Sequence, residues 1–190
     1  GNVPQSLKWD PDRLPLSVDT YLRLAAKHPA AITVLPETAI PLFFSEVPRD
    51  VLRGLTLRGD ALIGVAVGTT DGGYTNAAVA LTPELKAKAY AKSHLVPFGE
   101  YAPPGFAWFF RFARIPMSDF TAGPAHQDPL DIGGQRVAPN ICYEDLFGEE
   151  LLAALPAATL FVNLSNTAWF GDSLAQPQHL QIAQLRAIET

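Results

Sequence analysis

Short apolar runs alternate with segments of helical period along this chain. Apolar residues recur every three or four positions in four segments, which predict helices at residues 17–27, 49–58, 148–155 and 180–189. Shorter, mostly apolar runs predict strands at residues 31–35, 61–68, 74–81, 87–91, 137–141 and 159–163. Strands that are apolar throughout need cover on both faces. The pattern therefore predicts an α/β sheet with helices on its outer face and another layer on its inner face.

Neither an internal repeat nor a low-complexity linker interrupts this pattern, so we expect one domain over residues 1–190. The helical period of residues 180–189 continues to the end of the sequence without a cap or a following glycine. We therefore expect the chain to be a fragment, cut at its C-terminal end.

Composition narrows the class of protein. The 190 residues are 48% hydrophobic and 17% charged, which is typical of a packed globular domain. A net charge of -5 without a lysine or arginine cluster argues against a nucleic-acid partner. No apolar stretch reaches the roughly 18 residues that a membrane span needs, and residues 1–4 contain no signal core. We expect the chain itself to be soluble or peripheral.

Cys142 is the only cysteine and the first candidate for chemistry. It follows the predicted strand 137–141 and precedes a predicted helix. The first free N–H groups of a helix stabilise a thiolate, which makes such a cysteine a good nucleophile. The alternative is a buried cysteine that packs as a small hydrophobe.

Glu37 and Lys92 also follow predicted strands, at residues 31–35 and 87–91. Strand ends are where open sheets build their sites. A thiol needs a base, which a carboxylate supplies, and an ammonium stabilises the oxyanion formed when a carbonyl is attacked. Taken singly, Glu37 is equally explained as a helix-start acid and Lys92 as a solvated strand-end charge.

The histidines, His28, His94, His126 and His179, lie far apart without a metal-binding spacing. We therefore expect no metal and no other cofactor. We expect His94, close to Lys92 in sequence, to make local hydrogen bonds.

Residues 35–39, 90–101 and 140–144 resemble the Glu-Lys-Cys signatures of the nitrilase (carbon–nitrogen hydrolase) superfamily. Within it, the chain is most similar to the catalytic domain of the bacterial apolipoprotein N-acyltransferase family. The segments Pro97-Phe98-Gly99-Glu100-Tyr101 and Trp169-Phe170-Gly171 are the most specific, and the resemblance extends over essentially the whole chain. It implies an αββα sandwich, here without the family's final strands.

The resemblance implies that Glu37 is the general base, Lys92 the oxyanion stabiliser and Cys142 the nucleophile. Glu100 matches a second glutamate, which either orients Lys92 by ion pairing or takes part in proton transfer. Other matched positions are Tyr143 and Glu144 beside the nucleophile and Trp9 near the start. For Tyr143 and Trp9, core packing is the alternative.

The implied reaction transfers an acyl chain from a phospholipid to Cys142 as a thioester. The α-amino group of an S-diacylglyceryl-cysteine lipoprotein then takes up the chain. Lys92 would lower the pKa of the thiol in the resting enzyme. The resemblance also implies a full-length protein in the bacterial inner membrane, with this domain facing the periplasm.

An aromatic stretch at residues 103–117 suits a lipid-facing lid, because rings and arginines are typical of a bilayer interface. Its candidates are Trp108, Phe109, Phe110 and Phe112, and the alternative is an ordinary core helix. Residues 42–44 are a second candidate for an acyl-chain wall.

Two other functions stay open. A soluble amidase or nitrilase would use the same three residues with water in place of the amine, and the aromatic stretch argues against it. A catalytically inactive fragment would only dock on membranes or lipoproteins.

Overall fold

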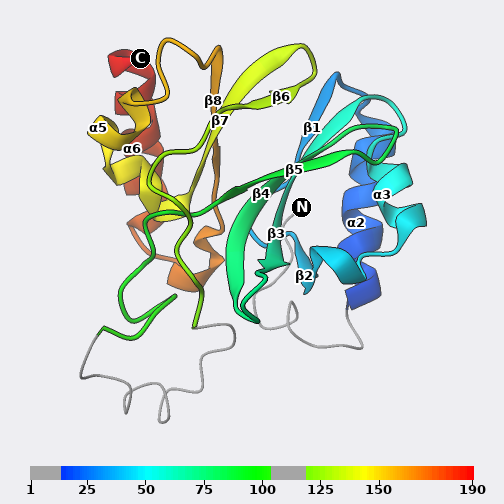
Figure 1. Ribbon diagram of the computed structural model, residues 1–190, viewed down its shortest axis with the longest axis horizontal. Coiled ribbons are helices and arrows are strands. Elements are labelled where there is room, and N and C mark those ends of the chain that lie inside the picture. The colour runs from blue at the N-terminus through cyan, green and yellow to red at the C-terminus, as the bar shows by residue number, and fades with distance from the viewer. Residues whose placement is uncertain (1–13, 104–118) are drawn as a thin grey trace.

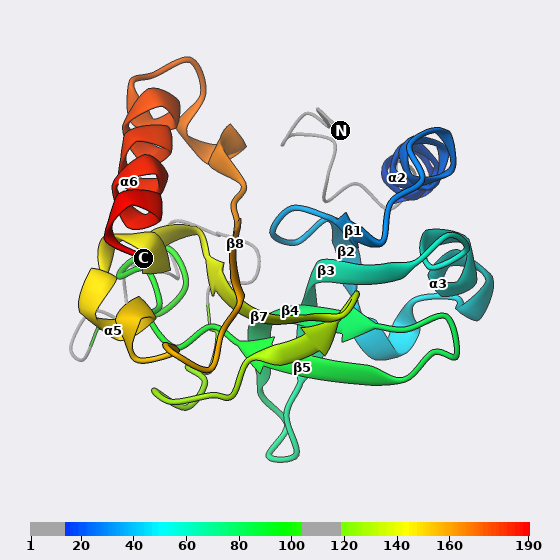
Figure 2. The ribbon, with the colours of Figure 1, turned by 90° about the horizontal axis from the view of Figure 1, so that it is seen from above.

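Two β-sheets pack face to face, with helices on the outer side of each (Figures 1 and 2). The computed structural model describes residues 14–103 and 119–190. Helices α2 (Leu14–Lys27) and α3 (Arg49–Leu55) cover one sheet, and α5 (Gly148–Leu152) and α6 (Ala175–Glu189) lie on the opposite side. The predicted αββα layering is confirmed.

Strand β3 (Asp60–Gly68) is the centre of the first sheet. It pairs antiparallel with β4 (Tyr74–Leu81), which in turn pairs antiparallel with β5 (Ala87–Ala91). Its other edge pairs in parallel first with β1 (Ile32–Val34) and then with β2 (Ile40–Phe43). The chain between β1 and β2 therefore lies against the middle of β3, and Glu37 is on this connection.

The second sheet contains β6 (Leu130–Ile132), β7 (Gln135–Ile141) and β8 (Leu160–Leu164). Strand β7 pairs antiparallel with β6 and in parallel with β8. Cys142 follows β7 directly and begins η3 (Cys142–Leu146), a 3-10 helix that precedes α5, the helix predicted at residues 148–155. Two further 3-10 helices are η2 (Phe44–Glu46) and η4 (Thr167–Phe170).

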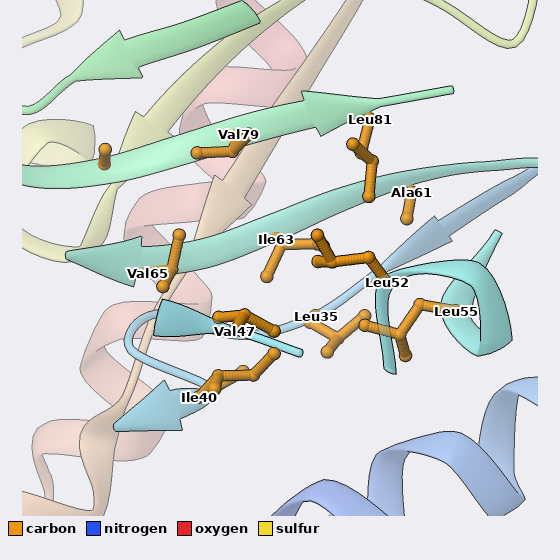
Figure 3. Close-up of a cluster of buried hydrophobic side chains, with 12 residues drawn as sticks. Leu35, Ile40, Val47, Leu52, Leu55, Ala61, Ile63, Val65, Val79 and Leu81 are labelled. Atoms are coloured by element: carbon orange, nitrogen blue, oxygen red, sulfur yellow. The ribbon is translucent and has the colours of Figure 1, made fainter. Parts of the chain in front are cut away.

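Two hydrophobic clusters hold the layers together. One lies between the first sheet and its helices, where side chains from β3 and β4 meet Leu52 and Leu55 of α3 (Figure 3). The other joins the two sheets, where Leu62 and Ala78 meet Leu130, Val137 and Ile141. The buried strands β3 and β4 thus contribute to both clusters, as expected for strands that are apolar on both faces.

Most predicted elements are present, but their burial differs in places. Strand β1 was expected to be buried, whereas Val34 is 46% exposed because β1 pairs only at the edge of the sheet. Strands β2 and β6 were missed, because Pro41 argues against a strand in the first and the second is only three residues between Pro129 and Gly133. Helix α6 begins before the predicted residue 180.

Within the described ranges of the chain, every helix is too short or too polar to cross a membrane.

Gly64 of β3 connects the fold to the site, because its backbone touches the β1–β2 connection. A Cβ added there would lie 2.7 Å from the Cα of Glu37. We expect Gly64→Ala to displace that connection and lower the free energy of unfolding by about 1–3 kcal/mol, as overpacking does. Gly68→Ala is the matched control, because a Cβ at the end of the same strand meets nothing within 4 Å. Equal urea midpoints for the two variants would contradict the prediction.

Candidate active site

Lys92 is a fully buried ammonium held between two carboxylates. It follows β5, its exposed fraction is 0%, and its backbone N–H donates to the carbonyl of Asn76 over 2.8 Å. Its Nζ lies 2.8 Å from Oε2 of Glu100 and 3.6 Å from Oε1 of Glu37. Burial alone would lower the pKa of Lys92, but the two carboxylates outweigh it and the pKa is raised. Lys92 is therefore a permanent cation at neutral pH.

Asn76 joins the two carboxylates from the floor of the site. Its Nδ2 donates to Oε1 of Glu37 and to Oε1 of Glu100, each over 2.8 Å. Asn76 is a buried residue of β4, 2% exposed. Its two hydrogen bonds hold both carboxylates in positions that face Lys92. Sequence reasoning missed Asn76. The available signal was a strongly polar side chain within a strand of otherwise buried, mostly apolar residues.

Glu100 is placed to orient Lys92. Its Oε2 also accepts the Val96 N–H over 2.8 Å, and the residue is 9% exposed. With Lys92, Asn76 and Val96 as partners, the carboxylate is held on all sides by groups of the protein. Of the two roles left open by the sequence, this geometry favours ion-pair support.

Glu37 is held from two elements of the fold. Besides the bond from Asn76, its Oε2 accepts the backbone N–H of Asn166 over 3.1 Å. It is 8% exposed, and the following Thr38 has a positive φ of 44°. A carboxylate fixed in a partly desolvated position beside a thiol is suited to act as a base.

Cys142 occupies a strained turn at the end of β7. Its φ is 52°, in the left-handed region, which costs a residue other than glycine about 1–3 kcal/mol. Its carbonyl accepts a hydrogen bond from Nδ2 of Asn163 over 3.3 Å. The residue as a whole is partly exposed.

The pKa of the Cys142 thiol is raised above its ordinary value, which corrects the expectation that Lys92 or a helix start would lower it. Burial is the largest cause, and the charge of Glu37 adds to it. His179 and Lys92 act in the opposite direction without overcoming burial. The resting group is therefore a protonated thiol at neutral pH, and it needs a base before it can attack.

Glu144 joins the loop that bears Lys92 to the turn that bears Cys142. Its Oε1 accepts from the Ser93 N–H at 2.7 Å, the Ser93 hydroxyl at 2.9 Å, the His94 N–H at 3.2 Å and the Tyr90 hydroxyl at 3.0 Å. Its Oε2 accepts from the Ile141 N–H at 2.7 Å. The residue is 2% exposed. This single carboxylate therefore sets the position of Cys142 relative to Lys92.

The remaining candidates are placed differently. Tyr143 packs edge-on against His94 and Phe147, whereas Trp9, Trp108, Phe109, Phe110 and Phe112 lie outside the described residues. Leu42 and Phe44 pack on the core, and Phe43 packs edge-on against Tyr74. His94 Nδ1 lies 3.2 Å from Oε1 of Glu150, 56 positions along the chain, so this contact is not the local one that was expected.

His179 is a second residue that sequence reasoning passed over. It comes from α6, and its ring interacts with the Cys142 thiol and with Asp145. Nothing in the local sequence marked it, because Asp145 and Cys142 are more than thirty positions away. In the two described ranges, no group of His, Cys, Asp and Glu side chains is arranged to hold a metal ion.

The fold brings together Glu37, Lys92 and Cys142, with Glu100 behind Lys92 and Glu144 behind Cys142. A carboxylate, an ammonium and a thiol in mutual electrostatic contact have the groups needed for nucleophilic attack on a carbonyl carbon.

The profile of the carbon–nitrogen hydrolase family matches residues 2–190. An apolipoprotein N-acyltransferase of Nitrosomonas europaea is 47% identical over all of this chain, and one of Chromobacterium violaceum is 48% identical. The chain spans 40% and 38% of the length of these two curated relatives.

Solved structures share the fold at low sequence identity. A CN-hydrolase superfamily protein of Xanthomonas campestris has a TM-score of 0.66 at 20% identity, covering 91% of this chain and 65% of that one. A nitrilase-superfamily protein of Saccharomyces cerevisiae has a TM-score of 0.64 at 15% identity, covering 98% and 68%.

Glu144→Gln tests the link between the two loops. The glutamine side chain retains one acceptor oxygen, but its NH2 group replaces the other carboxylate oxygen. A backbone N–H that donated to that oxygen then faces a second donor and loses its partner. We expect the free energy of unfolding to fall by about 2–3 kcal/mol, because an unsatisfied buried donor costs that much. Glu149→Gln, at an exposed position of α5, is the matched control and should have little effect. Urea unfolding measures both, and a similar small loss in each would contradict the prediction.

Proposed function

Since the chain belongs to the carbon–nitrogen hydrolase family, we propose that its site transfers acyl chains through a thioester on Cys142, as an apolipoprotein N-acyltransferase. The observation that carries the proposal is the buried Glu37–Lys92–Glu100 cluster beside a protonated thiol. Identity of 42–48% with several curated apolipoprotein N-acyltransferases supports the choice of reaction.

In the first half-reaction, Glu37 takes the proton of the Cys142 thiol as the sulfur attacks an ester carbonyl of a phospholipid. Lys92 stabilises the oxyanion, because its raised pKa keeps the ammonium charged throughout. The tetrahedral intermediate then expels the glycerol oxygen, which receives the proton from Glu37. The products are a thioester on Cys142 and a free lysophospholipid.

In the second half-reaction, the α-amino group of an S-diacylglyceryl-cysteine attacks the thioester carbonyl. Glu37 takes a proton from the nitrogen, Lys92 again stabilises the oxyanion, and the sulfur leaves. Protonation of that sulfur restores the thiol and leaves an amide on the lipoprotein. Glu100 acts only through Lys92 in this scheme, and Glu144 acts through the backbone on either side of it.

An apolar acyl chain fits the surroundings of the site. Phe43, Tyr74 and Phe120 form a row of rings, with centroid distances of 5.6 and 5.0 Å. Tyr74 is two positions before Asn76 on β4, so both project from the same face of the strand. This row favours a lipid over a small amide. We assign the phospholipid and the diacylglyceryl lipoprotein as the two substrates.

A lipid substrate implies a membrane surface as a partner. We propose that the whole protein resides in the bacterial inner membrane with this domain on the periplasmic side. The proposed lipid-facing residues are Trp108, Phe109, Phe110 and Phe112, and Trp9 and Tyr143 are proposed to contact substrate.

The test is the intact mass of the full-length protein after incubation with phospholipid vesicles and, separately, with a short-chain amide. We expect a long-chain adduct from the vesicles that is absent in Cys142→Ala and is discharged by a diacylglyceryl lipopeptide. Turnover of the amide alone would favour a small-molecule hydrolase. No adduct and no turnover would leave a protein that only docks, and either result overturns the proposal.

Glu37→Gln tests the base. We expect acylation to slow by about 10²–10⁴-fold, the usual contribution of a positioned base, with a smaller loss at high pH, where the thiol ionises without help. Glu84→Gln, in the exposed turn between β4 and β5, is the matched control. Equal rates for these two variants would remove Glu37 from the mechanism.

A further inference from the structure

We propose that His179, held by Asp145, is a positioning residue for Cys142: an imidazolium that faces the sulfur and stabilises its thiolate from the side of α6. The proposal rests on the function above only in taking Cys142 as the nucleophile. It adds a second cation to a site in which Lys92 is the expected one.

The geometry places the imidazole firmly. His179 Nδ1 lies 2.9 Å from Oδ2 of Asp145, and Nε2 lies 2.8 Å from the Ser165 hydroxyl oxygen. Asp145 is 2% exposed and stands three residues after Cys142 in η3. Side chains three apart eclipse one another in a 3-10 helix, so a ring bound to Asp145 lies beside the thiol. The ring is close enough to the Cys142 side chain to lower the pKa of its thiol.

The same histidine also reaches the backbone of the nucleophile. Ser165 donates its hydroxyl to Oδ1 of Asn163, and Nδ2 of Asn163 donates to the Cys142 carbonyl over 3.3 Å. His179, Ser165 and Asn163 therefore form a chain of hydrogen bonds that ends on the strained turn. One side chain thus contacts the sulfur directly and supports its backbone indirectly.

Charge explains why the ring is a cation. Asp145 is a buried carboxylate, which needs a partner of opposite charge. The hydrogen bond to Asp145 is the largest of the causes that raise the pKa of His179 to about 10, ahead of the bond to Cys142. The ring is therefore protonated at neutral pH.

Three charged groups face the sulfur, each from a different part of the fold. Glu37 disfavours the thiolate, whereas Lys92 and His179 favour it. Asp145 and Cys142 are the titratable groups that act on His179. Lys92 is ion-paired with Glu37 and Glu100 and His179 with Asp145, and of these two cations His179 lowers the pKa of the Cys142 thiol more. His179 is therefore the cation whose removal should change the thiolate population most directly.

The test is the rate at which iodoacetamide alkylates Cys142 in the full-length protein between pH 5 and 10, read at the Cys142 peptide by mass spectrometry. In His179→Gln we expect about tenfold slower alkylation at pH 7 and a pH profile moved upward, because loss of a neighbouring cation disfavours the thiolate. His28→Gln, at an exposed position after α2, is the matched control and should follow the wild type. An unchanged pH profile in a folded His179→Gln would overturn the proposal.

Asp145→Asn keeps the ring but removes its carboxylate, so His179 should titrate near its ordinary value of about 6.5. We expect alkylation close to the wild type below that pH and close to His179→Gln above it. A purely structural role would lower the rate equally at every pH. If thermal unfolding shows that His179→Gln does not fold, the pH profile of alkylation in Asp145→Asn decides alone. An Asp145→Asn profile parallel to that of the wild type would then overturn the proposal.

Alkylation requires no lipid, so the two proposals can fail separately. A shifted pH profile without an acyl adduct would retain the role of His179 and remove the acyltransferase function. An acyl adduct with an unshifted profile would do the reverse.

Discussion

The buried ammonium of Lys92 is the constraint on which the rest of the site depends. An unpaired charge in this position would cost several kcal/mol, so at least one of its two carboxylates must remain. Glu37 comes from the β1–β2 connection and Glu100 from the chain after β5, and Asn76 of β4 binds both. The close contact of Gly64 with the Glu37 backbone allows the Glu37 carboxylate to reach Lys92. The first sheet is thereby built around one ion-pair cluster.

The second sheet is joined to this cluster by another buried carboxylate. Glu144 accepts from Ser93 and His94 after β5 and from Ile141 at the end of β7. The hydrophobic contact between the sheets buries apolar surface but does little to fix how one sheet is oriented on the other. These hydrogen bonds do fix it, because they require a defined distance and angle. The strained Cys142 turn is therefore fixed relative to Lys92 by a group that needs no contact with substrate.

The Cys142 thiol is protonated in the resting site, as its burial and the neighbouring Glu37 require. Burial and Glu37 disfavour the thiolate, so the negative charge forms only when the sulfur gives its proton to the base. In the mechanism proposed above, Lys92 then faces the oxyanion and His179 faces the sulfur. Charge stabilisation would thus follow the reaction from sulfur to carbonyl oxygen and back.

The sequence by itself determined the layering, most strands, and Glu37, Lys92 and Cys142 as strand-end candidates, because periodicity and strand ends are local properties. It could not give β2 and β6, where proline and glycine within or beside the segment mask the strand pattern. Nor could it give Asn76 or the His179–Asp145 pair, because the residues that come into contact there are distant in the chain. It also gave the wrong direction for the thiol pKa. That pKa is the sum of burial and of charges from the β1–β2 connection, the chain after β5 and α6, and only the tertiary structure decides how near those groups lie.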